Sequence, residues 1–383
     1  MKAIAFLVGD LGIAGGGERV VCTLANFLVQ YYDVHIFHFG TEHPFEIIGN
    51  VKVHDLNVIT KNRYLRKIDR LFLLRKNLKE SKISLIINFG WQPAIYTLIA
   101  SVGLNLKILS SERNNPMLEP NQKILKIIRN VAYKKSNFLV CQTQAAKKYF
   151  NITQSKVVLN PLRDDIPMPM DFRYRENLIV NFCRLYTQKN LPLLIKAFKK
   201  FHVTHPFYLL KIYGDGELKL ELLKLIDYLD LTHFVQILPF RANILDSIKV
   251  AKMFVSSSNY EGLSNSMLEA LALGIPVVVT DCPIYGARMV VNDYKNGIIV
   301  PMNDLDRMCD AMSFLADNEE KSKQISDEAI KIRDFLSVEA VCKEWKRLID
   351  IVLSKRETGK SGFSVEQKKW FNKRGKENDR NNV

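Results

Sequence analysis

Short apolar runs alternate with longer segments of helical pattern along most of this chain, and this alternation is the strongest constraint on its fold. The first strand-like runs lie at residues 3–8, 34–39, 85–89, 107–111 and 137–142. The helix-length segments between them lie at residues 18–31, 64–81 and 121–135. Strands that are apolar throughout are buried on both faces, so the pattern predicts a parallel sheet covered by helices on both sides.

A second series of the same kind follows a break. Residues 160–176 contain three prolines and several charged residues, which is typical of a linker. The later strand-like runs lie at residues 178–182, 208–213, 235–238, 253–256, 276–280 and 297–300. We therefore predict an α/β protein with two doubly wound, Rossmann-like domains facing across a cleft, where ligands bind at the carboxyl ends of the strands.

The predicted limits are residues 1–165 for the N-terminal domain, 166–176 for the linker and 177–336 for the C-terminal domain. A helix at residues 337–354 is expected to pack back toward the N-terminal domain. Residues 355–383 are polar and basic, and their few branched apolar side chains predict a disordered tail.

The charge of the chain is uneven. Its 383 residues include 55 Lys and Arg against 40 Asp and Glu, a net charge of +15. Residues 1–175 carry a net +12, residues 176–354 a net −2 and the tail a net +5. This excess indicates an anionic partner of the first half: nucleic acid, a membrane or a phosphorylated substrate. Nucleic acid is disfavoured, because the chain lacks an aromatic-rich basic motif and a recognition-helix signature.

Several classes of protein are excluded early. No apolar stretch approaches the roughly 18 residues of a membrane-spanning helix, and the apolar start is too short for a signal peptide. The six cysteines are far apart and form no C-x-x-C pair, so we expect neither a zinc site nor a disulfide framework. These features favour a reduced, cytoplasmic setting.

Three consecutive glycines, Gly15 to Gly17, follow the first strand and open a helix. The backbone amides of Gly16 and Gly17 can approach an anion closely there, and the helix dipole favours negative charge. The spacing matches neither the dinucleotide fingerprint nor a P-loop. A glycine-rich turn without a ligand is the alternative.

Two cations follow the first strand of the second domain. Arg184 offers a planar fork and Lys189 a point charge, which together can clamp a diphosphate. Gly214 and Gly216 end the next strand at the same edge of the sheet. The alternatives are two solvated loop cations and a tight turn.

The most specific string runs from Glu261 to Glu269 between two later strands. Ser264 or Asn265 is a good N-cap for the following helix, so the backbone amides of Leu263, Ser264 and Asn265 face the cleft near a phosphate. This arrangement places Glu261 near a sugar and lets Glu269 accept two hydrogen bonds from a ribose diol. Two glutamates eight residues apart are common by chance, and the specificity lies in the whole string.

With these motifs, the chain resembles the retaining glycosyltransferases of family 4, which have the GT-B fold. The resemblance covers nearly all of residues 1–354. It also rests on the motifs at residues 274–278 and 296–301. It implies a nucleotide-sugar donor in the second domain, with diphosphate contacts from Arg184 and Lys189. It also implies a ribose contact from Glu269, a sugar contact from Glu261, an acceptor site in the first domain and no metal ion or other cofactor.

Residues 108–116 and 159–161 are most similar to bacterial enzymes that extend undecaprenyl-diphosphate-linked oligosaccharides. The first of these segments contains Glu112 and Arg113, which we expect to contact the acceptor or the sugar. Three positions depart from the family pattern. Arg113 stands where related enzymes often have His, Cys183 where Gly is usual, and Met289 where Glu is usual.

The predicted reaction moves a hexose or N-acetylhexosamine from a nucleoside-diphosphate sugar, expected to be a UDP-sugar, to a polyprenyl-diphosphate-linked saccharide. Arg184, Lys189 and the helix amides stabilise the charge on the leaving phosphate, and this phosphate takes the proton of the acceptor. Glu261 is expected to orient the sugar and not to be a covalent nucleophile. A transferase for a soluble acceptor, a nucleotide-sugar epimerase and a non-catalytic membrane-bound scaffold are the alternatives, and the two glutamates disfavour the epimerase.

Two segments of the first domain are both basic and amphipathic. Residues 61–82 carry nine Lys and Arg against two acids, and residues 123–148 carry seven Lys and Arg and no acid. Helices of this kind lie on anionic lipid, although a core-facing apolar stripe with solvated cations is the bland alternative. We expect a peripheral protein on the inner face of the cell membrane, with that anionic surface as a partner and no nucleic acid.

Overall fold

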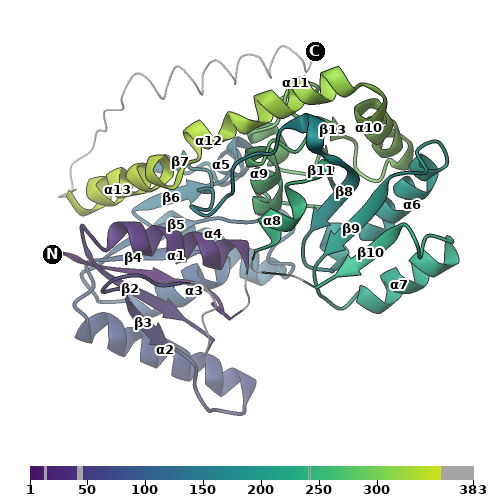
Figure 1. Cartoon of the computed structure of the whole chain (residues 1–383). Coiled ribbons are helices and arrows are strands. Elements are labelled where there is room, and N and C mark those ends of the chain that lie inside the picture. The colour runs from purple at the N-terminus through teal and green to yellow at the C-terminus, as the bar shows by residue number, and fades with distance from the viewer. Residues whose placement is uncertain (13–14, 41–45, 240, 242, 355–383) are drawn as a thin grey trace.

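The computed structural model describes residues 1–12, 15–40, 46–239, 241 and 243–354. It contains two α/β units, each built on its own parallel sheet (Figure 1). This confirms the predicted fold class of two doubly wound, Rossmann-like domains. The tail at residues 355–383 lies outside the described residues, so its expected disorder stays a prediction.

The first sheet has seven parallel strands in the order β3-β2-β1-β4-β5-β6-β7. Its strands are β1 (Ala3–Leu7), β2 (Asp33–His38), β3 (Lys52–Asp55), β4 (Leu85–Phe89), β5 (Lys107–Ser111), β6 (Phe138–Cys141) and β7 (Ser155–Val157). The helices of this part are α1 (Gly16–Leu28), α2 (Arg63–Glu80), α3 (Trp91–Ala100), α4 (Lys123–Lys135) and α5 (Gln144–Phe150).

The second sheet has six parallel strands in the order β10-β9-β8-β11-β12-β13. They are β8 (Glu176–Phe182), β9 (Leu209–Tyr213), β10 (Val235–Leu238), β11 (Ala251–Ser256), β12 (Val277–Thr280) and β13 (Ile298–Val300). The later helices are α6 (Leu191–His202), α7 (Lys219–Tyr228), α8 (Ile244–Ile248), α9 (Asn265–Ala272), α10 (Leu305–Asp317), α11 (Glu319–Ile330), α12 (Ile332–Phe335) and α13 (Val338–Ser354).

Both faces of the first sheet are covered, as its apolar strands predict. Along β1, Ile4 and Phe6 pack into the same core as α1 and α13, whereas Ala5 and Leu7 pack into a separate core with α2 and α3. Successive side chains of a strand point to opposite faces, so a strand between two helical layers is apolar at every position.

The last described helix crosses back to the first sheet and lies beside α1 (Figure 1). Trp345 of α13 is fully buried, and its ring stacks on Phe89 with a centroid separation of 5.5 Å. The hydroxyl of Tyr32 donates a hydrogen bond of 2.6 Å to Asp350. Helix α13 therefore forms part of the core beneath the loops of the first sheet.

The connection between β7 and β8 is anchored at both ends. The backbone amide of Leu162 donates to the carbonyl of Leu336. Arg175 is buried and donates to the carbonyls of Ala251 and Leu273 at 2.8 and 2.7 Å. These contacts fix the path of the chain as it enters the second sheet, which positions the two sets of loops described next.

Candidate active site

The loops at the carboxyl ends of the two sheets meet at the start of α9. Ser264 is the N-cap of this helix, and its hydroxyl accepts a hydrogen bond from the amide of Met267. This confirms the expectation that Ser264 or Asn265 caps the helix. The side-chain amide of Asn265 donates at 3.1 Å to the carbonyl of Gly16 in the other domain. Two of the predicted donor-binding residues are thus brought together from opposite sheets.

The glycine turn before α1 is tight at one residue and open at the next. A Cβ atom on Gly16 would lie 2.4 Å from the side-chain nitrogen of Asn265, so a larger residue there would require the Asn265 amide to move. A Cβ atom on Gly17 would meet nothing within 4 Å. Packing therefore explains Gly16, while the space at Gly17 is available to a ligand.

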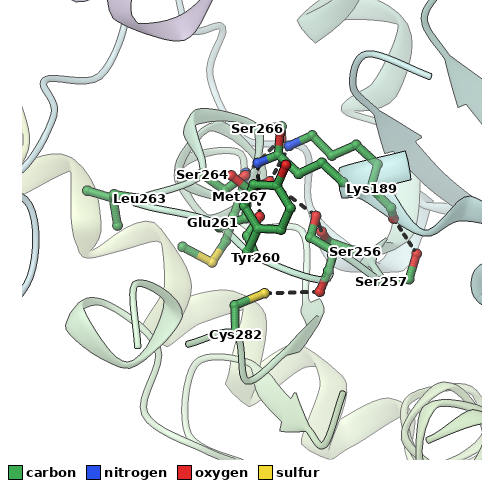
Figure 2. Close-up of polar contacts among 12 residues, drawn as sticks. Lys189, Ser256, Ser257, Tyr260, Glu261, Leu263, Ser264, Ser266, Met267 and Cys282 are labelled. Atoms are coloured by element: carbon green, nitrogen blue, oxygen red, sulfur yellow. Dashed lines mark hydrogen bonds and ion pairs between the residues drawn. The ribbon is translucent and has the colours of Figure 1, made fainter. Parts of the chain in front are cut away.

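Glu261 forms an ion pair with Lys189, and Figure 2 shows the lysine extended toward this carboxylate beside the start of α9. The hydroxyl of Ser258 donates to the same carboxylate at 3.1 Å. Burial by itself lowers the pKa of Lys189, but the Glu261 carboxylate outweighs this effect and holds the pKa above its usual value. Two residues predicted for catalysis thus lie in direct contact.

Glu269 is buried, with 5% of its side chain exposed, and it forms an ion pair with Arg19 of α1. Glu269 belongs to the second domain and Arg19 to the first, so this pair bridges the two sheets. The prediction of a ribose-binding carboxylate one turn into the helix placed Glu269 correctly along α9. Arg19 was not assigned a role, although it directly follows the glycine run and Glu18.

Arg184 is exposed at the cleft, and its guanidinium lies 5.5 Å from the centre of the Tyr186 ring. Within the part of the chain that the structure describes, no carboxylate lies within ion-pair distance of it. Arg184 is therefore available to an external anion, in contrast to Lys189.

Gly214 and Gly216 let the loop after β9 pack against the loop that carries Arg184. A Cβ atom on Gly214 would lie 1.9 Å from the carbonyl oxygen of Cys183, and one on Gly216 would lie 2.6 Å from that of Leu185. The two glycines thus position the Arg184 loop through backbone contact. Burial raises the pKa of the Cys183 thiol to about 12, so it is neutral in the cell.

Glu112 and Arg113 both make contacts within the first domain. Glu112 is 2% exposed, and its carboxylate accepts hydrogen bonds from the backbone amides of Arg113 and Asn114 and from the hydroxyl of Tyr133. Burial raises the pKa of this carboxyl. In this geometry the Glu112 carboxylate holds its own loop, and its contact with the acceptor or the sugar stays a prediction.

Arg113 packs inward from the same loop. Its guanidinium lies 4.2 Å from the Phe89 ring and 5.4 Å from the Trp345 ring, and it donates to the side chain of Asn160. Burial lowers the pKa of Arg113 to about 9. Its Nε and Nη2 atoms are shielded from solvent. The side chain supports the loop and the α13 contact and also forms part of the wall of the pocket described below, so its contact with the acceptor or the sugar stays a prediction.

Gln142 and Asn160 connect the two domains, and the motif analysis assigned neither of them to the site. Asn160 accepts from Gln142 at 2.8 Å and donates to Asn265 at 2.6 Å. Gln142 also accepts from the backbone amide of Leu263 at 3.3 Å. One of the amides expected to face a phosphate is therefore bonded to a side chain of the first domain. Asn160 lies in one of the segments that carried the resemblance, which was the available signal.

A pocket of about 510 Å³ opens at the carboxyl edge of the first sheet. Its wall consists of Val8, Gly9, Asp10, Gly15, Gly16, Gly17, Glu18, Phe39, Arg70, Phe89, Gln92, Arg113, Asn114 and Arg184. Only Arg184 comes from the second domain. The pocket therefore lies on the predicted acceptor side and reaches the cation that is available to the donor diphosphate.

The basic helices of the first domain expose large apolar side chains. On α2 these include Tyr64, Leu65, Ile68 and Phe72, and on α4 they are Ile124, Ile127 and Val131. Not all of the cations on these helices are exposed, because Arg129 is fully buried and donates to the carbonyl of Pro116.

Within the described segments, no helix has the length and hydropathy to cross a bilayer, and no cluster of three potential metal ligands is present.

Two family models match the chain, one for each sheet. The model described as Glycosyltransferase Family 4 matches residues 14–155, and the model described as Glycosyl transferases group 1 matches residues 164–332. Together with the fold, they confirm the family and the GT-B architecture that the motifs indicated.

Individual proteins agree with these matches. An α-1,4-N-acetyl-D-galactosaminyltransferase from Campylobacter jejuni, named for a diphospho-undecaprenol-linked substrate, is 29% identical over 365 residues, covering 91% of this chain and 98% of that protein. The structure of sucrose-phosphate synthase from Thermosynechococcus elongatus matches with a TM-score of 0.82 at 14% identity, over 92% of this chain and 100% of that one. HepE of Anabaena, in complex with UDP-glucose, matches with a TM-score of 0.78 at 17% identity, over 92% and 100%.

Proposed function

The chain belongs to the family 4 glycosyltransferases with the GT-B fold, and from this premise we propose that it transfers a hexose or N-acetylhexosamine to a lipid-diphosphate-linked saccharide. The donor is a nucleoside-diphosphate sugar, with UDP as the nucleotide, and the anomeric configuration is retained. The acceptor class follows the names of the Campylobacter relatives, and the nucleotide follows the UDP complexes of HepE. The product belongs to the assembly of a surface polysaccharide or glycan.

The observation that carries this proposal is the arrangement of charge around the start of α9. Glu261 precedes the start of this helix and Glu269 lies one turn into it, and each forms an ion pair with a cation. Arg184 is available beside them. A nucleotide sugar fits this set because the diphosphate takes Arg184 and the helix amides, while the carboxylates take the hydroxyl groups of the ribose and the sugar.

The chemical step is the transfer of an anomeric carbon. The bond from this carbon to the diphosphate oxygen breaks, a new bond to the acceptor oxygen forms, and the acceptor proton passes to the leaving phosphate. Negative charge grows on that phosphate, and Arg184, Lys189 and the amides of Ser264 and Asn265 stabilise it, whereas the amide of Leu263 donates to Gln142. Removing one such preorganised donor raises a barrier by about 3 kcal/mol. These groups supply positive charge directly, so no metal ion or other cofactor is part of the proposal.

Glu261 orients the donor sugar in this scheme. Its carboxylate already accepts from Lys189 and Ser258, and both hydrogen bonds favour a fixed, ionised acceptor for sugar hydroxyl groups. Gly16 and Gly17 let the backbone approach the donor from the opposite domain. Gly214 and Gly216 contribute indirectly, by positioning the Arg184 loop.

The protein binds the membrane that holds its acceptor through the exposed sides of α2 and α4. Ile68, Phe72 and Ile127 are exposed there among lysines and arginines. Apolar side chains gain free energy on entering the lipid interface, and cations are attracted to anionic headgroups. The protein is therefore peripheral on the cytoplasmic, inner face of the cell membrane, where nucleotide sugars are available.

A donor screen with the purified full chain tests this function. UDP-sugars are combined with a short-chain polyprenyl-diphosphate saccharide, and products are identified by mass and by the configuration of the new linkage. We expect one sugar to be added with retention, together with release of UDP. Transfer to a free saccharide at equal efficiency would indicate a soluble acceptor. A protein that binds UDP-sugars and transfers them to neither acceptor would be a scaffold, and the proposal would be wrong.

A further inference from the structure

Glu18 belongs to the Gly15–Arg19 motif, and the proposed donor chemistry does not use its side chain, whereas the neighbouring Arg19 is paired with Glu269. It lies in the first turn of α1 and forms part of the wall of the 510 Å³ pocket. Arg184, in the second domain, is close enough to interact with its charge. Glu18 therefore stands where the acceptor pocket meets the site of the leaving phosphate.

The pocket wall contains two carboxylates, and only one of them has an evident structural role. Asp10 accepts a hydrogen bond of 2.9 Å from the amide of Gly12, and its carboxylate packs against Gly40. For Glu18, the described part of the chain offers no cation within ion-pair distance. Asp10 is thus used to shape the turn after β1, whereas the Glu18 carboxylate remains available to a ligand.

The surroundings of Glu18 make its ionised, unpaired carboxylate energetically unfavourable. Burial raises its pKa, and the charge of Asp10 adds to this rise, while its own backbone amide and Arg184 oppose it. A partly buried carboxylate without a paired cation is destabilising unless it gains a hydrogen-bond donor. Perturbed carboxylates in a cleft are over-represented at functional sites for this reason.

The other side chains of the pocket indicate which kind of ligand supplies the hydrogen-bond donor for Glu18. Phe39 and Phe89 contribute an apolar part of the wall, and the amides of Gln92 and Asn114 offer both donors and acceptors. Two further cations of the wall already have protein partners, because Arg70 donates to the carbonyl of Phe39 and Arg113 to the side chain of Asn160. An ionised carboxylate is an acceptor only and repels another anion. These groups match a neutral sugar ring with hydroxyl donors better than they match the diphosphate of a lipid carrier.

We propose that Glu18 contacts the terminal sugar of the acceptor and accepts a hydrogen bond from the hydroxyl group that attacks the donor. This inference rests on the proposed function and names the acceptor residue of that reaction. Glu18 aligns the hydroxyl oxygen with the anomeric carbon and forms no covalent bond. The hydroxyl proton still passes to the leaving phosphate, so Glu18 returns unchanged.

The test compares Glu18→Ala and Glu18→Gln with the wild type in steady-state transfer and in UDP binding by calorimetry. Glu18→Ala should raise the acceptor KM or lower kcat by about tenfold or more, the cost of losing a hydrogen bond to a charged acceptor. The UDP Kd should stay within about twofold of wild type. Glu18→Gln keeps an acceptor oxygen in place and should recover part of the lost kcat/KM, which a purely structural loss does not predict.

Glu320→Gln is the matched control, because Glu320 is an exposed glutamate in the first turn of α11, far from the pocket. Thermal melting checks that each variant is folded. Unchanged acceptor kinetics in Glu18→Ala, or a parallel loss of UDP binding, would overturn the inference while transfer by the wild type continues. Failure of the proposed function is a different result, because the wild type would then transfer to no acceptor.

Discussion

The two glutamates that flank the start of α9 are both bound to cations, but the partners come from different places. Glu261 pairs with Lys189 of its own domain, whereas Glu269 pairs with Arg19 of the other domain. The first pair is part of a rigid loop, since Ser258 and Gln188 bond to the same segment. The second pair connects the two domains at the proposed ribose site.

The comparison shows that one helix terminus serves two purposes. In the proposed complex, a donor sugar at Glu261 contacts a carboxylate whose position is fixed by residues of its own domain. A ribose that meets Glu269 competes with Arg19 and so acts on the contact between the domains. Under the proposed function, ribose binding at Glu269 would therefore act on the interdomain ion pair, whereas sugar binding at Glu261 would involve only the local loop.

The largest effect should come from breaking the Glu261 pair. Glu261→Gln removes the charge that orients the sugar and holds Lys189, so kcat should fall about 100- to 1,000-fold while UDP binding changes little. Steady-state kinetics and calorimetry measure the two quantities. A covalent glycosyl adduct trapped on Glu261 would contradict the proposed orienting role.

The same variant has a consequence for the pH dependence. In the wild type, Glu261 holds the pKa of Lys189 above its usual value. In Glu261→Gln, burial is the largest remaining influence, Arg184 acts in the same direction and only Cys183 opposes them, so the pKa falls and Lys189 loses its proton at a lower pH. The alkaline limb of the pH profile of kcat should therefore shift to lower pH in the variant. An unchanged limb would show that the activity does not depend on the protonation of Lys189.

Removing Arg184 should weaken donor binding without lowering the stability of the protein. Arg184→Ala deletes a charge-assisted contact to the diphosphate, so the Kd for UDP should rise about tenfold or more. Arg173→Ala is the control, because Arg173 is exposed and pairs with Asp171 away from the cleft. Equal UDP affinity in both variants would place the diphosphate elsewhere.

Substitutions of the two members of the interdomain ion pair, Arg19 and Glu269, should have opposite effects on UDP binding. Arg19→Gln leaves Glu269 buried without its cation, so the free protein should melt earlier and UDP should bind about fivefold more tightly. Glu269→Gln should weaken UDP binding because the ribose loses its carboxylate. Calorimetry and melting with and without UDP measure both, and weaker binding in Arg19→Gln would show that Arg19 contacts the donor itself.

The smallest effect concerns the membrane face, where many side chains contribute. Phe72→Ser should lower binding to anionic vesicles by about threefold, because one exposed aromatic side chain no longer enters the interface. Phe207→Ser is the control, since Phe207 is 84% exposed in the second domain. Binding should also decrease with salt, and equal binding to neutral and anionic vesicles at low salt would contradict the proposed surface.

Local pattern was sufficient for most of the strands. The predictions for β4, β5 and β10 match the observed limits, because each is a short apolar run followed by polar or turn residues. The strands that were not predicted are β3, a partly exposed edge strand of polar composition, and β7, with three residues. Such segments carry too few apolar residues to reveal a period, and pairing with a neighbour forms them.

The order of motifs along the chain therefore determined the fold class, the family and the N-cap of α9, because these depend on periodicity and on residues adjacent in sequence. Only the tertiary structure decided which charges meet. Arg19 and Glu269 are 250 positions apart, and Gln142 meets Leu263 across 121 positions. It also placed Glu112 against Tyr133, and it placed Arg113 against Phe89 and Trp345 at the wall of the pocket. Long-range packing leaves no local signal, so the partners of a charged side chain become known only when the sheets are placed together.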